Sequence, residues 1–475
     1  MRWKLILTVL AFLWTLPAWA GPSDIPASEI DAVFAAYDKP DSPGCALGLI
    51  RDGELVYSRG YGQANLEYGI PLSSKSVFRI GSTSKQFTAA AIFLLEQDGR
   101  LSLDDDIRKH VPELPAYQAP VTIRHLVHHT SGIRDYLTLM SLAGLRDADF
   151  YTDEEVIAML ARQKELNFAP GEEHLYSNSG YFLLAEIVKR ASGKSLREFA
   201  AERIFTPLGM KNSHFHNDYQ MIVPNRASGY ARRPEGAFRI SMTTLEMIGD
   251  GGVFTSIEDL LLWDRNFYSR KVGGDALFER QHETGRLNDG ESLTYAGGLT
   301  VAKYRGLPTV RHGGAFVGFR AELLRFPEQR LSIACLCNLA QTRPSDLANQ
   351  VADIVLQDEF TEPKSGPGPR SERDAEAQQE PSWRPDRDAL AAFAGRYHSP
   401  ELDSTLEVFL EGETLRVRNV DAFREAPEDP LQPDSPNQFR LGRIRLRFEV
   451  GDNRAARHFR MDAGRVKNIL FERLP

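Results

Sequence analysis

The chain has 475 residues, of which 42% are hydrophobic and 26% are charged, and this composition is ordinary for a globular protein with a full-sized core. Its formal net charge of -8 argues against nucleic acid as a partner, because proteins that bind nucleic acid present a basic surface. The length suggests about three domains, although catalytic domains can run long.

The first twenty residues have the pattern of a secretory signal peptide. Arg2 and Lys4 precede an apolar run from Leu5 to Leu16, and the small-residue pattern Ala18-Trp19-Ala20 follows. The run is too short for a comfortable membrane span, and no other stretch approaches its hydrophobicity. We therefore expect residues 1–20 to be removed and the mature protein to be periplasmic or extracellular, without stable membrane insertion.

Residues 44–70 predict a β-hairpin, and the first cysteine lies in it. Gly44 to Ile50 is strand-like, Asp52-Gly53 is a turn signal, and Leu55-Val56-Tyr57 resumes the strand pattern. Three cysteines are too few for a disulfide framework, so burial as small hydrophobic side chains is the favoured interpretation. In an oxidising compartment, a single bridge from Cys45 to Cys335 or Cys337 is the alternative.

Ser82 stands three residues before Lys85, at a point where a helix is expected to begin. The apolar residues that follow contain no proline, and Gly99 is a natural stop. Residues three apart lie on one helix face, so Lys85 can reach the Ser82 hydroxyl, and an adjacent amine is a known way to activate a serine. The unpaired N–H groups of the first turn would stabilise negative charge. The alternative is that Ser82 only caps the helix.

Acidic and histidine clusters after this helix do not predict a metal site. Asp104-Asp105-Asp106 is typical of a solvated turn before Ile107, and His125, His128 and His129 lack other ligands at zinc-binding spacing. Residues 133–151 show no clear period and could form a lid or a wall of a cleft.

Tyr176-Ser177-Asn178 precedes an apolar-periodic helix expected from about Gly180 to Ala191 and closed near Gly193. A tyrosine and an asparagine at this spacing can point into one cleft. The alternative is that Asn178 caps the helix and Tyr176 packs. A glycine-rich stretch at 249–252 predicts a further loop-to-helix start, without implied chemistry.

A meander of strands is predicted from residue 299 onward. Its expected strands are Leu299 to Tyr304, Thr309 to His312, Phe316 to Phe326 and Leu331 to Leu339. We expect His312-Gly313-Gly314 to stand at the end of a strand, where paired glycines leave room for a ligand.

Ser82-x-x-Lys85, Tyr176-x-Asn178 and His312-x-Gly314 each occur once, in this order. With them the chain resembles the serine β-lactamase and penicillin-binding protein superfamily over residues 25–358, especially its class C β-lactamase, D-aminopeptidase and DD-peptidase branch. The resemblance implies an α+β fold, in which helices flank an antiparallel sheet and a helical subdomain is attached. It implies no metal and no cofactor.

The resemblance also implies roles for single residues. Ser82 would be the acylated nucleophile, held and deprotonated with the help of Lys85, while Tyr176 would accept and return a proton. Asn178 would bind the substrate amide, and His312 would assist Tyr176. Substrate would also contact the backbone of Gly313, Gly314 and Ala315, and the N–H groups of Ser82 and Ala315 would form the oxyanion hole.

The histidine of the third motif departs from class C β-lactamases, which have lysine there, and shifts the prediction toward peptidases. We expect a serine hydrolase that acts through an acyl-enzyme on small peptides, D-amino-acid derivatives or esters. The alternatives are a β-lactamase or esterase and, with little support, a noncatalytic binder of peptidoglycan fragments.

The composition changes sharply after Phe360. Residues 361–385 are rich in Pro, Gly, Ser, Glu, Arg and Gln and predict a flexible linker. Residues 386–475 alternate apolar and polar side chains, as in Ile444, Leu446, Phe448 and Val450, which predicts strands with one buried face. The stretch from Gly395 to Leu402 resembles the start of the small lipocalin-like β-barrel appended to some superfamily peptidases. Such a domain could shape the cleft mouth, join subunits into an oligomer or only add bulk.

Overall fold

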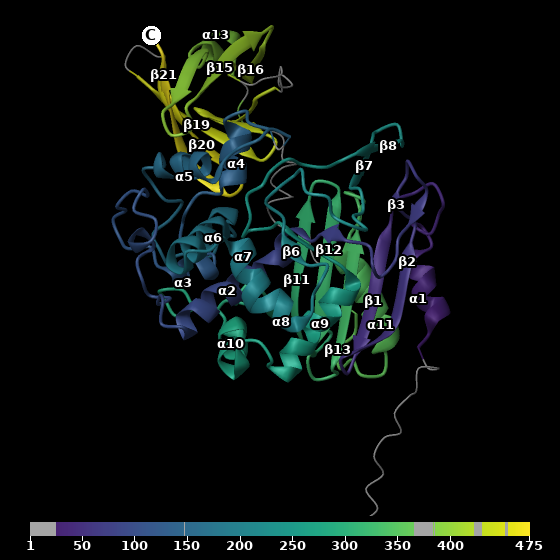
Figure 1. Ribbon diagram of the computed structural model, residues 1–475. Helices are drawn as coiled ribbons and strands as arrows, with labels where there is room; N and C mark the ends of the chain where they lie inside the picture. Colours follow the sequence, from purple (N-terminus) through teal and green to yellow (C-terminus); the bar gives the residue numbers. More distant parts are fainter. Residues whose placement is uncertain (1–24, 147, 365–382, 384, 422–429, 452–454) are drawn as a thin grey trace, which may run out of the picture.

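The computed structural model describes residues 25–146, 148–364, 383, 385–421, 430–451 and 455–475 (Figure 1). The predicted signal peptide and most of the predicted linker at 361–385 lie outside these residues. Among the described residues, no helix is both long and apolar enough to cross a membrane.

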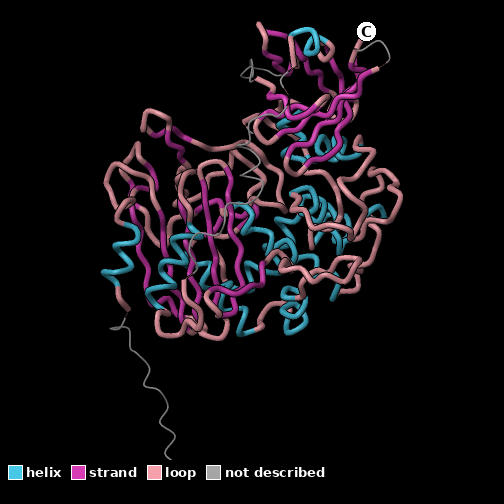
Figure 2. The backbone as a smooth tube through the Cα atoms, turned by 180° about the vertical axis from the view of Figure 1, so that it is seen from behind, coloured by secondary structure: helices cyan, strands magenta, loops and turns pink. Residues whose placement is uncertain are grey.

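A six-stranded antiparallel sheet organises the larger part of the molecule (Figures 1 and 2). In spatial order its strands are β10 (Thr300–Tyr304), β11 (Leu307–Phe316), β12 (Phe319–Phe326), β13 (Leu331–Cys337), β1 (Cys45–Arg51) and β2 (Glu54–Tyr61). The predicted hairpin at 44–70 is confirmed, since β1 pairs with β2 across the turn at Asp52 and Gly53. The N-terminal strands thus insert beside the C-terminal strand of the same sheet.

Side-chain alternation places an apolar layer on each face of this sheet. Cys45, Leu47 and Leu49 of β1 pack toward α1 (Ala27–Phe34) and α11 (Pro344–Val355), in one buried cluster with Ile333 of β13. Ala46 belongs to the larger cluster on the other face, where α9 (Ile257–Ser269) and the helical part of the molecule pack. Two buried faces explain why β1 and β13 are almost continuously apolar.

A disulfide links the two strands at this junction. Cys45 lies opposite Cys337 in the β1–β13 register, and the two sulfurs are bonded, whereas Cys335 is a buried free thiol. The prediction that all three are simply buried hydrophobic side chains is therefore wrong for Cys45 and Cys337 and confirmed for Cys335. Neighbouring strands bring these two Cα atoms to 4.0 Å, which a sequence without a known register does not reveal.

The helical part surrounds α2 (Lys85–Gln97), whose residues from Lys85 to Leu95 are all buried. Around it lie α3 (Ile123–Val127), α4 (Tyr136–Leu142), α5 (Asp153–Ala161), α6 (Asn178–Ser192), α7 (Leu196–Ala200), a π-helical turn (Ala201–Phe205), α8 (Thr206–Leu208) and α10 (Gly274–His282). The α4 helix interrupts residues 133–151, where the sequence showed no period. The α6 helix closes at Gly193, as predicted, in the left-handed conformation.

Short elements connect the sheet to these helices. They are β3 (Gln63–Asn65), β4 (Ile70–Pro71), β5 (Phe78–Arg79), η2 (Gly81–Ser84), η3 (Ile107–Lys109), β6 (His214–Phe215), β7 (Tyr230–Arg232), β8 (Phe238–Ile240) and β9 (Val253–Thr255). Ser256 caps α9 by accepting a hydrogen bond from the Asp259 N–H, so the loop-to-helix start predicted after the glycine-rich stretch is confirmed.

The position predicted for His312-Gly313-Gly314, at the end of a strand, is wrong. All three lie inside β11, which continues to Phe316, and the turn to β12 falls at Val317 and Gly318. The glycines are needed for another reason. A Cβ on Gly314 would stand 1.9 Å from the carbonyl oxygen of Ile80. The strand therefore needs a residue without a side chain where the segment before Ser82 crosses it.

The C-terminal residues form a second, eight-stranded antiparallel sheet that is nearly closed into a barrel. Its strands in spatial order are β16 (Thr414–Asn419), β15 (Ser404–Glu411), β14 (Gly395–Ser399), β21 (Val466–Arg473), β20 (Ala456–Ala463), β19 (Ile444–Val450), β18 (Gln438–Leu441) and β17 (Gln432–Ser435). Its ends approach each other where the Leu431 N–H donates to the Leu415 carbonyl. Helix α13 (Arg387–Ala391) precedes it, and the barrel stands on the α4 and α5 side of the molecule (Figure 1).

Candidate active site

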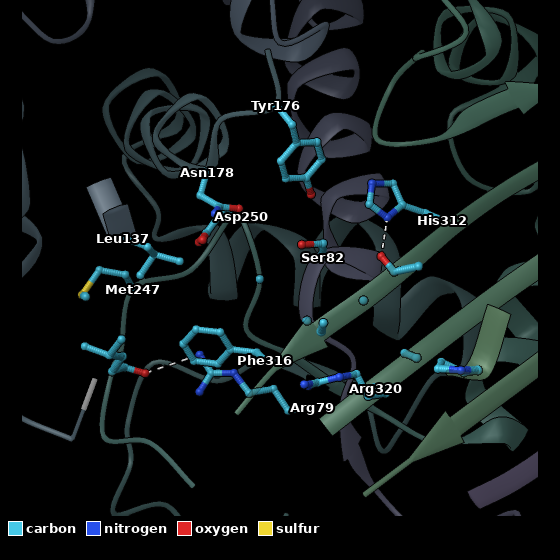
Figure 3. Close-up of a pocket in the computed structure, with 18 of the residues that line it drawn as sticks. Arg79, Ser82, Leu137, Tyr176, Asn178, Met247, Asp250, His312, Phe316 and Arg320 are labelled. Carbon is cyan, nitrogen blue, oxygen red and sulfur yellow. Dashed lines mark hydrogen bonds between the residues drawn. The ribbon is translucent and has the colours of Figure 1, made fainter. Parts of the chain in front are cut away.

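Ser82 lies in the 3₁₀ turn η2, one turn before α2. The sequence predicted a helix from Ser82 onward, but the α-helix begins at Lys85. Gly81 has φ 51°, a conformation that favours glycine, and a Cβ there would stand 2.8 Å from the Ala315 nitrogen. This tight turn between β5 and α2 presents Ser82, half-buried, beside β11 (Figure 3).

Lys85 is fully buried, and its ammonium nitrogen meets three oxygen acceptors. It donates to the Ser82 hydroxyl at 3.3 Å, to the Asn178 side-chain oxygen at 2.9 Å and to the Asp250 main-chain carbonyl at 2.5 Å. Three N–H donors and three acceptors match, so the side chain is held in one position. The spacing argument placed Lys85 within reach of Ser82, and the geometry agrees.

Tyr176 approaches Ser82 and Lys85 from the loop before α6. The Ser177 N–H donates to Nδ1 of His129, whose ring packs against the Tyr176 ring at 4.2 Å between centroids. The Tyr176 hydroxyl is buried and has no hydrogen-bond partner among the described residues. Figure 3 shows it directed toward Ser82. Because the Lys85 nitrogen lies 4.8 Å from the same ring, the phenol stands beside a cation and a serine hydroxyl.

His312 is held by two protein contacts. Its Nδ1 donates to the Gly313 carbonyl at 2.6 Å, so Nε2 accepts from the Tyr295 hydroxyl at 3.0 Å. Burial, and then the charge of Lys85, lower the pKa of His312 to about 4. The ring is therefore neutral near pH 7. Its direct partner is Tyr295, and its ring centroid lies 6.3 Å from that of Tyr176.

The side chains surround a cavity of about 490 Å³. The predicted residues that line it are Ser82, Tyr176, Asn178, His312, Gly313, Gly314 and Ala315, while Lys85 lies beneath Ser82. Tyr136 and Leu137 of α4 also line it, so a wall is confirmed for residues 133–151. A nucleophile, a phenol and an amide thus face one space, with an amine bonded to the nucleophile from beneath, and this set suits acyl transfer.

Sequence reasoning missed several residues of this site. Asp250 supplies the carbonyl that holds Lys85, and burial raises the pKa of its carboxyl group, which accepts from the Tyr136 hydroxyl. Arg79, Arg320 and Arg465 bring positive charge to the cavity. The glycines around Asp250 signalled a special backbone there, but nothing local marks the arginines.

The acidic and histidine clusters have structural roles. Asp106 caps η3, and His125 forms a capping box with Thr122 at the start of α3. Both ring nitrogens of His128 contact main-chain carbonyls. Among the described residues, one cluster has ligand types at metal-binding distances, namely the three cysteines, and two of these form the disulfide.

Comparisons with known proteins agree with this geometry. The family model described as Beta-lactamase matches residues 30–357. D-aminopeptidase of Gluconobacter oxydans is 29% identical over 66% of this chain, and that of Cereibacter sphaeroides is 30% identical over 65%. The chain spans about 60% of the length of either relative.

Solved structures show the same fold. The octameric penicillin-binding protein homologue from Pyrococcus abyssi superposes with a TM-score of 0.63 and 25% identity, covering 94% of this chain and all of that one. The D-amino acid amidase from Ochrobactrum anthropi has a TM-score of 0.58 and 23% identity, covering 70% of this chain and 99% of that one. Since the family model spans more than half of the residues, the chain belongs to the Beta-lactamase family.

Proposed function

We propose that the protein is a serine hydrolase that cleaves amide bonds of D-amino-acid amides and small D-peptides through an acyl-enzyme. The observation that carries the proposal is the convergence of Ser82, Tyr176 and Asn178 on one cavity, with Lys85 bonded to Ser82 and Asn178 and a buried phenol hydroxyl that lacks a partner among the described residues. The names of the 29–30% identical D-aminopeptidases support the substrate class.

In the acylation step, the Ser82 oxygen attacks the substrate carbonyl carbon, and the carbonyl π electrons move to its oxygen. The Ser82 proton passes to the Tyr176 oxygen, and this step requires Tyr176 to enter it deprotonated, as a phenolate beside the Lys85 ammonium group. The main-chain N–H groups of Ser82 and Ala315 would stabilise the negative oxygen. When the tetrahedral intermediate collapses, the carbon–nitrogen bond breaks, and Tyr176 returns the proton to the leaving amine.

Deacylation repeats these transfers with water. Tyr176 accepts a proton as water attacks the ester carbonyl, and Ser82 recovers its hydroxyl when the ester bond breaks. Asn178 contacts Lys85 and also lines the cavity, so its amide can orient Lys85 while it meets the substrate amide. His312 is neutral and accepts a hydrogen bond from the Tyr295 hydroxyl. It would affect Tyr176 through the shape and polarity that it gives to the cavity wall.

Stereoselective hydrolysis tests the proposal. The purified protein should release p-nitroaniline from D-alanine p-nitroanilide at least about tenfold faster than from the L-enantiomer, because a preorganised site holds one orientation of the acyl carbon. Ser82→Ala should abolish both activities. Equal rates for the two enantiomers would contradict the D-substrate class. Turnover of a penicillin or a simple ester, with neither anilide cleaved, would instead favour a β-lactamase or an esterase.

We further propose that the protein is exported, that its C-terminal barrel is lipocalin-like, and that it oligomerises through this barrel. The sequence of residues 1–20 supports export. The antiparallel order of the eight barrel strands supports the barrel type. The similar Pyrococcus abyssi protein is octameric, which supports assembly. Cell fractionation and light scattering of the purified protein would test export and assembly.

A further inference from the structure

The C-terminal barrel contributes one side chain to the cavity that contains Ser82. Gly464 and Arg465 form the two-residue turn between β20 and β21, and Arg465 lines the cavity. Its guanidinium carbon lies 4.7 Å from the centre of the Tyr176 ring. A residue far from the three motifs in sequence therefore stands beside the group that we propose as proton donor to the leaving group.

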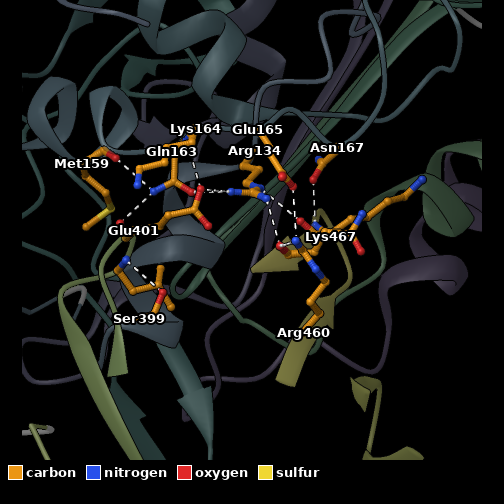
Figure 4. Close-up of polar contacts among 12 residues, drawn as sticks. Arg134, Met159, Gln163, Lys164, Glu165, Asn167, Ser399, Glu401, Arg460 and Lys467 are labelled. Atoms are coloured by element: carbon orange, nitrogen blue, oxygen red, sulfur yellow. Dashed lines mark hydrogen bonds and ion pairs between the residues drawn. The ribbon is translucent and has the colours of Figure 1, made fainter. Parts of the chain in front are cut away.

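The turn is held against the cavity wall by a buried polar network (Figure 4). Arg134, whose side chain is fully buried, donates to the carbonyls of Lys467 and Asn468 at 3.0 and 3.2 Å and forms an ion pair with Glu401 at 2.8 Å. Asn167 donates to the Arg465 carbonyl at 2.9 Å and accepts from the Lys467 N–H at 2.7 Å. The backbone on both sides of Arg465 is thus fixed relative to Tyr176.

The Arg465 guanidinium itself has free binding capacity. Its side chain is 43% exposed, and its nearest carboxylate, Asp135, is 3.8 Å away. The Asp135 oxygens already accept from the Thr138 N–H at 3.0 Å and from the Asn178 N–H at 2.7 Å. Among the described residues, the guanidinium forms no hydrogen bond within 3.5 Å. An arginine with a fixed backbone and unused donors is suited to a carboxylate.

The other charges of the cavity favour an anion as well. Three arginines and one aspartate line it, and the carboxyl group of that aspartate, Asp250, has a pKa raised by burial. Within the part of the chain that the structure describes, Arg320 donates only to main-chain carbonyls, those of Val317 and Phe319. Arg79 is 95% buried, and its Nε has no partner among the described residues. The cavity therefore presents more positive than negative charge to a substrate.

We infer that Arg465 forms a subsite for the carboxylate of the leaving amino acid, so that the enzyme prefers peptides with a free carboxylate next to the scissile bond over the corresponding carboxamides. This inference rests on the proposed function, because Tyr176 must lie on the leaving-group side. A leaving amino acid carries its carboxylate on the carbon next to its nitrogen, which brings that group from Tyr176 toward Arg465. The barrel then completes the substrate site.

The test compares D-alanyl-D-alanine with D-alanyl-D-alaninamide, which differ only in the charge of that group. Binding is measured by calorimetry in the full-length Ser82→Ala protein, where no turnover occurs, with Arg465, Arg465→Gln or Arg465→Lys. Arg396→Gln is the matched control, because Arg396 is an exposed residue on β14 of the same barrel and does not line the cavity. Melting curves establish that each variant is folded.

The acid should bind about tenfold more tightly than the amide, the scale of one charge-assisted hydrogen bond. Arg465→Gln should reduce this ratio to about one, Arg465→Lys should keep part of it, and Arg396→Gln should leave it unchanged. An unchanged ratio in Arg465→Gln, or no preference for the acid in the parent protein, would overturn the subsite. If protein with Ser82 restored cleaves neither compound while the acid still binds more tightly, the proposed function fails, and Arg465 is a carboxylate-binding residue but not a leaving-group subsite.

Discussion

At the scale of single residues, Lys85 and Tyr176 differ in how their polar groups are satisfied. The Lys85 nitrogen contacts three acceptors, on Ser82, Asn178 and the Asp250 carbonyl, so the side chain is held in one position. The Tyr176 hydroxyl, by contrast, is buried without a partner among the described residues. Burial of an unpaired hydroxyl costs free energy, and such groups cluster at functional sites. An amide group of the substrate would supply the missing hydrogen-bond partner of the Tyr176 hydroxyl.

Tyr176→Phe tests whether the Tyr176 hydroxyl takes part in the reaction. We expect turnover of a D-amino-acid anilide to fall at least about a hundredfold, because the phenol would no longer carry the proton between Ser82 and the leaving group. Tyr397→Phe is the control, since this buried tyrosine of the barrel donates to the Phe393 carbonyl and does not line the cavity. Steady-state kinetics of both variants measure the effect. Full activity of Tyr176→Phe would remove the phenol from the mechanism.

Residue types and spacing were enough to identify the motif side chains, which the structure brings to one cavity. They were not enough for Tyr295, Asp250 and Arg465. Tyr295 enters the site only because its loop packs against β11, and Arg465 only because a separate barrel docks on the wall. Neither has a local pattern that distinguishes it from other polar residues. Contacts that arise from tertiary packing join residues at no regular spacing in the sequence, so no sequence motif predicts them.

At the scale of elements, the crossing of β11 by the segment before Ser82 controls the site. A Cβ on Gly314 would meet the Ile80 carbonyl oxygen at 1.9 Å, whereas one on Gly313 would meet the end of the Glu322 side chain at 3.0 Å. A main-chain oxygen in a packed turn has little freedom to move, while a side-chain end has more. The two neighbouring glycines therefore have different constraints.

Gly314→Ala and Gly313→Ala form a matched pair that tests this crossing. Gly314→Ala should displace η2 and with it Ser82, lowering activity more than about tenfold and the free energy of unfolding by about 1–3 kcal/mol. Gly313→Ala should have the smaller effect on both. Urea unfolding and initial rates give the comparison. The opposite order would show that the crossing does not position the nucleophile.

The same elements show how far a sequence predicts a fold. Alternation and turn residues located the hairpin β1–β2 and the late meander, because these features are local. The extent of β11 was missed, since paired glycines are as typical of a strand end as of a strand crossed closely by another backbone. The Cys45–Cys337 pairing needed the register between strands 292 residues apart, which no local pattern contains.

At the scale of the whole molecule, buried and half-buried histidines link stability to pH. Burial lowers the pKa of His214, His282 and His312 to about 4. In the unfolded chain their pKa is about 6.5, so between about pH 6.5 and 4 the unfolded state binds more protons. The free energy of unfolding should therefore fall as the pH falls through this window.

His282→Gln tests the contribution of one histidine outside the cavity to this pH dependence of the free energy of unfolding. The neutral His282 ring donates to the Phe278 carbonyl at 2.7 Å, a contact that an amide can replace. Between pH 6.5 and 4, the variant should lose stability less steeply than the parent, by up to about 1.4 kcal/mol per pH unit. Urea unfolding at several pH values gives the two slopes, and equal slopes would contradict the buried neutral state.

The central claim is that Ser82 is the nucleophile of an acyl-transfer site completed by Lys85 and Tyr176. Intact-mass spectrometry of the purified protein after incubation with a fluorophosphonate tests it most directly, with Ser82→Ala as the control. A single adduct on the parent protein and none on the variant is the predicted result. An adduct of equal yield on Ser82→Ala, or none on a folded parent protein, would contradict the account.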